Sequence, residues 1–163
     1  MKTYALAAAG AAILIGVLYM AKKQPADEPA ASDAPRGIRN NNPLNIEFNQ
    51  RNNWNGQTGT DGRFATFETP FYGIRAGARM LKNYAANYNI RTVREIVGRW
   101  APAVENDVEA YVNSVVKRTG LFPDMYLAPG DYPILIAAMI HHENGQQPYD
   151  LALITEATQA GMA

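Results

Sequence analysis

Residues 133–145, PILIAAMIHHENG, predict the central helix of this chain. The stretch from Pro133 to Ile140 is apolar on every side of a helix, which is typical of a helix buried at the centre of a domain. Pro133 suits the first turn of that helix, and Asn144 and Gly145 supply its end. Other helices must therefore pack around this segment.

Start and stop signals predict further helices on either side. In chain order, these cover residues 69–88, 92–100 and 106–120, with a last helix from Pro148 towards the C-terminus. The clearest signal is the capping box of Thr92 and Glu95. The small, polar tail 155–163 is expected to fray or to dock on a neighbour.

Residues 40–62 contain eight Asn and three Gly, a composition typical of turns. Residues 63–68 alternate between polar and apolar, which predicts one short strand, and we expect it to pair with residues 45–48. The predicted fold class is therefore mainly α, an α+β domain with a minor short β-hairpin.

The N-terminus predicts a membrane anchor. Residues 4–21 carry no charge and are flanked by Lys2 and by Lys22 and Lys23. As a helix they would extend about 27 Å, close to the thickness of a bilayer core. A cleaved secretory signal and a buried core helix are the alternatives. We expect an anchor over 1–23, a Pro- and acid-rich tether over 24–35 and a globular domain over 36–163.

Composition excludes several classes of site and partner. The chain has 15 Lys and Arg against 15 Asp and Glu, so a nucleic-acid partner held by phosphate contacts is not expected. It has no Cys, which excludes a disulfide, a thiol nucleophile and a Cys-based zinc site. His141 and His142 are adjacent, about 100° apart on a helix, and cannot both chelate one ion. We expect no metal and no cofactor.

Glu143 is the most informative polar residue. It follows Ile136 and Ile140 on the same face of the predicted buried helix, in its last turn. Apolar neighbours and the helix dipole both disfavour a negative charge there, which suits a general acid that protonates a glycosidic oxygen. The alternative is a solvated residue at a helix end.

Other residues have weaker claims to a site. Glu47 and Glu105 lie in loops and are the candidates for a second carboxylate, whereas Asp107 and Glu109 are explained as first-turn acids. Aromatic side chains at the ends of elements, Trp100 and Tyr111 among them, can stack on sugar rings or simply pack in the core.

Several spaced motifs together resemble a known family. They are RGIRNNNPLNI (36–46), WNG (54–56), FATF (64–67), YGIR (72–75), RWAP (99–102), END (105–107) and HENG (142–145). The resemblance covers roughly residues 36–149 and is to bacteriophage virion proteins, described as structural proteins with a lysozyme-like, lytic-transglycosylase fold.

A fainter resemblance is to bacterial glucosaminidases that digest peptidoglycan. In these, a buried helix with a catalytic Glu precedes a loop similar to NPLNI (42–46) and a later segment similar to WAP (100–102). Here the helix ending in Glu143 follows both motifs. We therefore expect a circular permutation of that arrangement, in which Glu143 lies beside the loop 42–46.

These resemblances imply a lytic transglycosylase that cuts the bond between N-acetylmuramic acid and N-acetylglucosamine in peptidoglycan, for local wall digestion during genome entry. Glu143 would be the acid and base, and the sugars would be held by Asn42, Asn45, Trp100 and Tyr111. The chain would be single-pass in the virion membrane or host inner membrane, with peptidoglycan and other virion proteins as partners. A non-catalytic virion or glycan-binding protein and a host-lysis muramidase are the alternatives.

Overall fold

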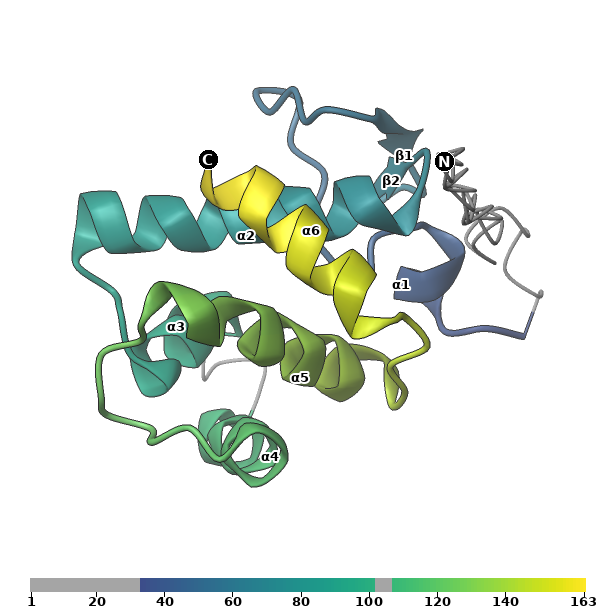
Figure 1. Cartoon of the computed structure of the whole chain (residues 1–163). Helices are drawn as coiled ribbons and strands as arrows, with labels where there is room; N and C mark the ends of the chain where they lie inside the picture. The colour runs from purple at the N-terminus through teal and green to yellow at the C-terminus, as the bar shows by residue number, and fades with distance from the viewer. Residues whose placement is uncertain (1–32, 102–106) are drawn as a thin grey trace, which may run out of the picture.

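The computed structural model describes residues 33–101 and 107–163 (Figure 1). The predicted anchor at 4–21 and most of the predicted tether lie outside these residues, as does Glu105. None of the helices in the described ranges is both long enough and apolar enough to cross a membrane.

The described part of the chain is mainly helical, as predicted. Its elements in chain order are α1 (Arg36–Arg39), β1 (Gln57–Thr60), β2 (Ala65–Phe67), α2 (Pro70–Tyr88), α3 (Val93–Trp100), α4 (Val108–Thr119), the 3₁₀ turn η2 (Pro129–Asp131), α5 (Tyr132–Asn144) and α6 (Leu151–Met162).

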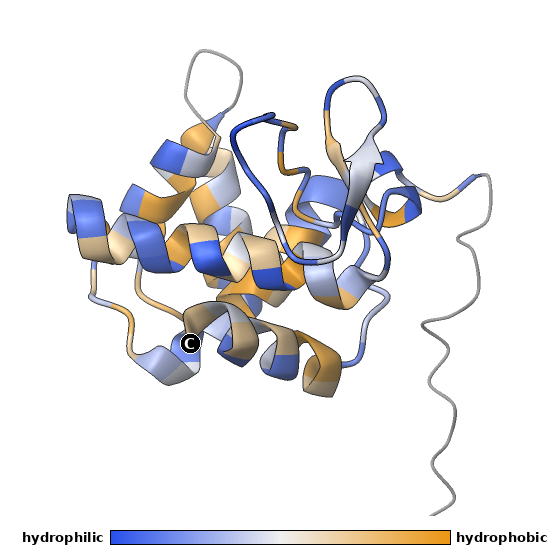
Figure 2. Ribbon diagram, turned by 90° about the horizontal axis from the view of Figure 1, so that it is seen from above, coloured by the Kyte–Doolittle hydropathy of each residue, from blue (hydrophilic) through white to orange (hydrophobic). Residues whose placement is uncertain are grey.

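Helix α5 lies at the centre of the domain, as its apolar sequence predicts. It packs against α4, α6, α2 and α1, and the side chains of Leu135, Ile136, Met139 and Ile140 are completely buried. Figure 2 shows the hydrophobic colouring concentrated where the helices face one another. A helix packed against four others needs little polar surface, which explains its sequence.

Helices α2 and α6 pack side by side, with α5 below them in the view of Figure 1. Close approach depends on Gly161, because a Cβ there would lie 2.5 Å from the Arg75 carbonyl oxygen and 2.6 Å from the Ala78 Cβ. The tail 155–163, which the sequence predicts to fray or to dock on a neighbour, is almost wholly helical and packs on α2 of the same chain. Helix α6 begins at Leu151, later than predicted from Pro148.

The predicted capping box of α3 is present, whereas α4 is capped by Asp107, a residue that the sequence predicts as a first-turn acid. The Thr92 hydroxyl accepts from the Glu95 amide at 3.2 Å, and the Glu95 carboxylate accepts from the Thr92 amide at 3.1 Å. At α4, the Asp107 carboxylate accepts from the Ala110 amide at 2.9 Å, and Gly120 ends the helix with φ of 72°. These bonds satisfy amides that a helix leaves unpaired at its start.

The predicted strand at 63–68 forms in part, as β2, and its main partner is different from the one predicted. β2 pairs antiparallel with β1. β1 was not predicted, because it lies in the Asn- and Gly-rich segment, whose composition is typical of turns. The expected partner, 45–48, contributes an isolated bridge between Glu47 and Phe64 and a bond from the Ala65 amide to the Ile46 carbonyl oxygen at 3.0 Å. The loop 42–46 is thereby attached to the hairpin.

Candidate active site

Glu143 lies in the last turn of α5, and two side chains donate hydrogen bonds to its carboxylate. The Tyr111 hydroxyl, from α4, donates to Oε1 at 3.0 Å, and the Asn45 amide donates to Oε2 at 3.0 Å. Each carboxylate oxygen therefore has its own donor, which fixes the orientation of the group. The predicted proximity of Glu143 to the loop 42–46 is confirmed.

The loop 42–46 has a backbone that favours Asn. Asn41 and Asn45 both adopt left-handed conformations with φ of 51°, which Asn tolerates better than most residues with a Cβ. Asn42 is completely buried, and its amide group donates to the carbonyl oxygens of Ile46 and Ala65, each at 2.9 Å. The prediction that Asn42 contacts a sugar is therefore corrected: its amide holds the loop in shape.

A second contact ties the end of α5 to the same loop. The buried Asn144 amide donates to the Pro43 carbonyl oxygen at 2.7 Å and to that of Ile140 at 2.8 Å. Gly37 of α1 closes this junction, because a Cβ there would lie 2.6 Å from the amide oxygens of both Asn144 and Asn45. The RGIR and HENG motifs are thus in contact through Gly37 and Asn144, next to Glu143 in the fold.

Tyr111 supports the site instead of lining it. It is 1% exposed, so its ring cannot stack on a sugar, which corrects that prediction. The ring of His142 stacks on it with centroids 3.6 Å apart. Burial, reinforced by the charge of Glu143, raises the pKa of Tyr111 well above its ordinary value, so the phenol remains a donor. Burial lowers the pKa of His142, which keeps that imidazole neutral at pH 7.

Glu143 faces a cleft of about 620 Å³. Trp100 lines it, as does Tyr84, and their rings pack edge to face with centroids 6.4 Å apart. Asn45 lines it beside Glu143, so two of the four predicted sugar-holding residues, Asn45 and Trp100, reach the cleft. A cleft with polar and aromatic walls and one oriented carboxylate suits a polyhydroxylated substrate.

The other predicted carboxylate in the described ranges, Glu47, also lines the cleft. Its side chain is 67% exposed and pairs with Arg63 at 3.0 Å. Asp61, by contrast, has a structural role: it binds Arg36 with two hydrogen bonds of 2.6 and 2.8 Å. The bonds from Arg36, with further hydrogen bonds from the Phe64 and Arg63 amides and the Asn40 side chain, hold the pKa of Asp61 well below its usual range.

Sequence reasoning missed several residues that line the cleft. They are Phe48, Asn49, Asn52, Arg63, Phe64, Met80, Tyr84 and Arg99. A signal existed for Asn49 and Asn52, which belong to the Asn-rich segment. Tyr84 lies four residues after Met80, so both project from one side of α2, but nothing local showed that this side faces Glu143.

Among the described residues, no three His, Cys, Asp or Glu side chains come close enough to hold a metal ion.

Comparison with known proteins places the chain among bacteriophage proteins. No protein-family model matches the sequence. It is 45% identical over 122 residues to Protein P5 of Pseudoalteromonas phage PM2, an alignment that covers 72% of this chain and 76% of that protein. At this identity and coverage, the chain belongs to the same family as Protein P5 of phage PM2.

Proposed function

We propose that the protein is a peptidoglycan lytic transglycosylase of lysozyme-like fold, with Glu143 as its single acid and base. The observation that carries the proposal is the carboxylate of Glu143 at the wall of a cleft, held by one donor on each oxygen. Such a carboxylate is held in one orientation, which suits proton transfer to and from a sugar bound in the cleft.

In the proposed reaction, protonated Glu143 gives its proton to the glycosidic oxygen that leaves C1 of N-acetylmuramic acid. The C1–O bond breaks, and positive charge develops on C1 and the ring oxygen. The Glu143 carboxylate then takes the proton of the C6 hydroxyl as O6 bonds to C1. The product is a 1,6-anhydro ring, no water is consumed, and Glu143 ends as it began.

The cleft walls suit the two sugars of the repeat. Trp100 and Tyr84 provide aromatic surface for stacking on the apolar face of a pyranose ring, and Asn45, Asn49 and Asn52 provide amide groups for hydroxyl and N-acetyl groups. Tyr111 and Asn42 are buried beneath this surface, where Tyr111 orients Glu143 and Asn42 holds the loop 42–46.

A hydrolase is the second candidate, because Glu47 lines the same cleft. A hydrolase normally uses two carboxylates roughly 5–9.5 Å apart, the second acting as base or nucleophile. The exposed ion pair of Glu47 with Arg63 favours a structural role for this group, so we prefer the transglycosylase.

The test is mass spectrometry of the products from purified peptidoglycan digested by the full chain. The proposal expects anhydro-muropeptides, their loss in Glu143→Gln, and their persistence in Glu47→Gln. Reducing-end products that require both carboxylates would establish a hydrolase. Glycan binding without products, by wild-type protein and Glu143→Gln alike, would leave a non-catalytic virion protein of the same fold.

Placement is also part of the proposal: the protein acts from the virion, attached to the virion membrane or host inner membrane through residues 4–21. Its membership of a phage family and the uncharged run at 4–21 support this placement. Detection of the chain in purified particles, in their lipid fraction, would test it. Presence only in the lysate would instead favour a host-lysis muramidase.

A further inference from the structure

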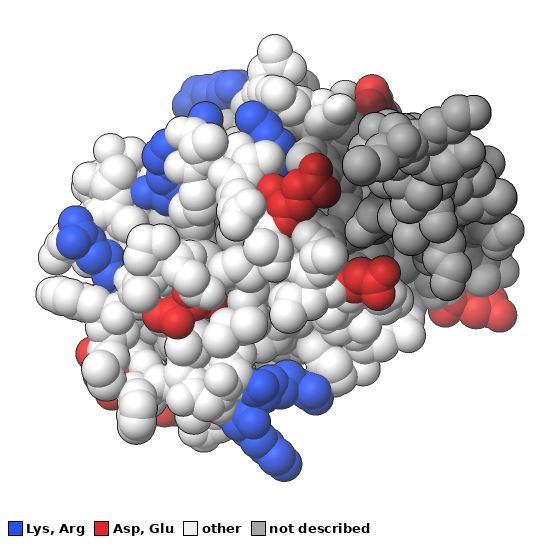
Figure 3. All heavy atoms as spheres, viewed as in Figure 1, with Lys and Arg blue, Asp and Glu red and all other residues white. Residues whose placement is uncertain are grey.

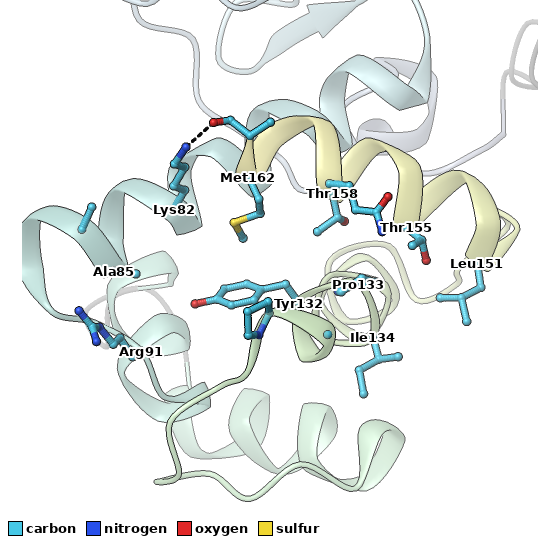
Figure 4. Close-up of a pocket in the computed structure, with 15 residues that line it drawn as sticks. Lys82, Ala85, Arg91, Tyr132, Pro133, Ile134, Leu151, Thr155, Thr158 and Met162 are labelled. Atoms are coloured by element: carbon cyan, nitrogen blue, oxygen red, sulfur yellow. Dashed lines mark hydrogen bonds between the residues drawn. The ribbon is translucent and has the colours of Figure 1, made fainter.

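A second cavity lies on the other side of α2 from the Glu143 cleft. Met80 and Tyr84 of α2 face the cleft, whereas Lys82 and Ala85 line the second cavity, which continues over α5 and α6 (Figure 4). We call this second cavity the α2–α5–α6 groove. Its volume is about 900 Å³, within the range of small-molecule sites.

The walls of the groove are largely apolar. Figure 4 shows Tyr132, Pro133 and Ile134 of α5 on one side and Met162 of α6 on the other, with Leu151 at one end. Leu151 is 52% exposed, an unusual position for a large aliphatic side chain. In Figure 3, which has the same view as Figure 1, the surface over α5 and α6 is mostly white, interrupted by a few acidic side chains in red.

The opposite end of the groove carries a positive charge. Arg91 lies there near the hydroxyl of Tyr132 (Figure 4). Burial raises the pKa of that phenol, and the positive charge of Arg91 opposes the rise. Within the described residues, the Arg91 guanidinium has no hydrogen bond or ion pair, and no Asp or Glu lines the groove.

Two acidic side chains close to Tyr132 and Arg91 in the sequence, Asp131 and Glu95, are hydrogen-bonded to backbone amides. The Asp131 carboxylate accepts from the Ala128 amide at 2.7 Å, and the Glu95 carboxylate accepts from the Arg91 amide at 2.9 Å. An anion at this end would thus meet a phenol and a guanidinium that has no partner among the described residues. The groove is complementary to a molecule that is long, apolar and negatively charged at one end.

We propose that the α2–α5–α6 groove binds a long-chain fatty acid. The carboxylate lies at the guanidinium of Arg91 and the hydroxyl of Tyr132, and the acyl chain extends past Pro133 and Met162 towards Leu151. Burial of the chain supplies affinity, and the charged end fixes its direction. This site is separate from Glu143 and does not depend on the proposed enzymatic activity.

The experiment is a fluorescence titration of the full chain with cis-parinaric acid and, separately, with its methyl ester. Arg91→Ala should weaken binding of the acid about tenfold, because one charged hydrogen bond is lost, and leave binding of the ester unchanged. Ala85→Trp fills the groove and should abolish saturable binding of both probes. Asn87→Trp, exposed on the same helix outside the groove, is the matched control and should bind both probes as the wild type does.

Equal affinity of the acid in wild type, Arg91→Ala and Ala85→Trp would overturn the proposal, since the probe would then bind elsewhere, for instance to residues 4–21. A dimer that Ala85→Trp dissociates, without saturable probe binding in the wild type, would assign the groove to a second copy and also overturn it. Circular dichroism checks that Ala85→Trp is folded; if it is not, Arg91→Ala with the acid and the ester still decides.

Discussion

Asn45 and Glu143, which are 98 positions apart in the sequence, are joined by a hydrogen bond of 3.0 Å between the Asn45 amide and the Glu143 carboxylate. This bond links an irregular loop near the start of the domain to the central helix near its end. Both groups line the cleft. The loop therefore has a direct part in orienting the proposed catalytic acid.

Replacing Asn45 by Gly should remove this donor without straining the loop, because Gly accepts the φ of 51° found at this position. Loss of a hydrogen bond to a charged group predicts a fall in glycan cleavage of roughly 10-fold or more. The rate of anhydro-muropeptide release measures it, with Asn53→Gly on the exposed part of the same segment as control. Equal rates for the two variants would contradict the orienting role.

Replacing Tyr111 by Phe tests the other donor. The buried ring and its stack on His142 are kept, and only the hydroxyl bonded to Glu143 is lost. Because Tyr111 does not reach the cleft surface, we expect kcat to fall roughly 10–100-fold with KM little changed. Steady-state kinetics on defined glycan fragments measures both constants. A rise in KM alone would indicate that Tyr111 contacts the substrate.

The helices could be predicted because their signals are local. The capping box of Thr92 and Glu95, the αL glycine at 120 and the continuous apolar run of α5 each depend on a few adjacent residues. The position of Glu143 on α5 followed from the same pattern. Its proximity to the loop 42–46 was expected from resemblance, and the Asn45 contact bears it out.

The roles of the surrounding residues could not be predicted, because they depend on contacts between distant segments. The local sequence does not distinguish an Asn whose side chain lines a cleft, as Asn45 does, from one whose amide binds two buried carbonyl oxygens, as Asn42 does. Likewise, nothing near Tyr111 shows that α4 presents it to α5. The short β1 was hidden by its polar composition.

Asp61 gives the fold a pH dependence. Its pKa in the folded protein is far below the value of about 3.9 expected when unfolded, so it stabilises the fold above pH 4 and loses this effect as the pH falls through the folded pKa. Asp61→Asn should lower Tm by about a few degrees at pH 7. Thermal melts at pH 7 and pH 3 should show a smaller difference between variant and wild type at the lower pH. A difference that does not narrow would mean that the charge is unimportant.

Gly161 should be intolerant of any side chain. A Cβ would lie 2.5 Å from the Arg75 carbonyl oxygen, a backbone atom that cannot move without shifting α2. Gly161→Ala should therefore destabilise the fold by about 1–3 kcal/mol, as overpacking does. Gly98→Ala is the matched control: it lies inside α3, has nothing within 4 Å of its Cβ, and should stabilise by about 0.5–1 kcal/mol. Urea unfolding of both variants measures the change in the free energy of unfolding, which should be a loss in Gly161→Ala and a gain in Gly98→Ala.

Tyr149 lies in the connection from α5 to α6, and removal of its hydroxyl should not destabilise the fold. Burial raises its pKa to about 12, and the buried hydroxyl has no hydrogen-bond partner in the described part of the chain. Burying an unpaired polar group costs free energy, so Tyr149→Phe should leave Tm unchanged or raise it by about a few degrees. Tyr132→Phe, at a hydroxyl that is less enclosed, should not raise Tm to the same degree. A clear loss of stability in Tyr149→Phe would mean that its hydroxyl has a partner, such as a buried water.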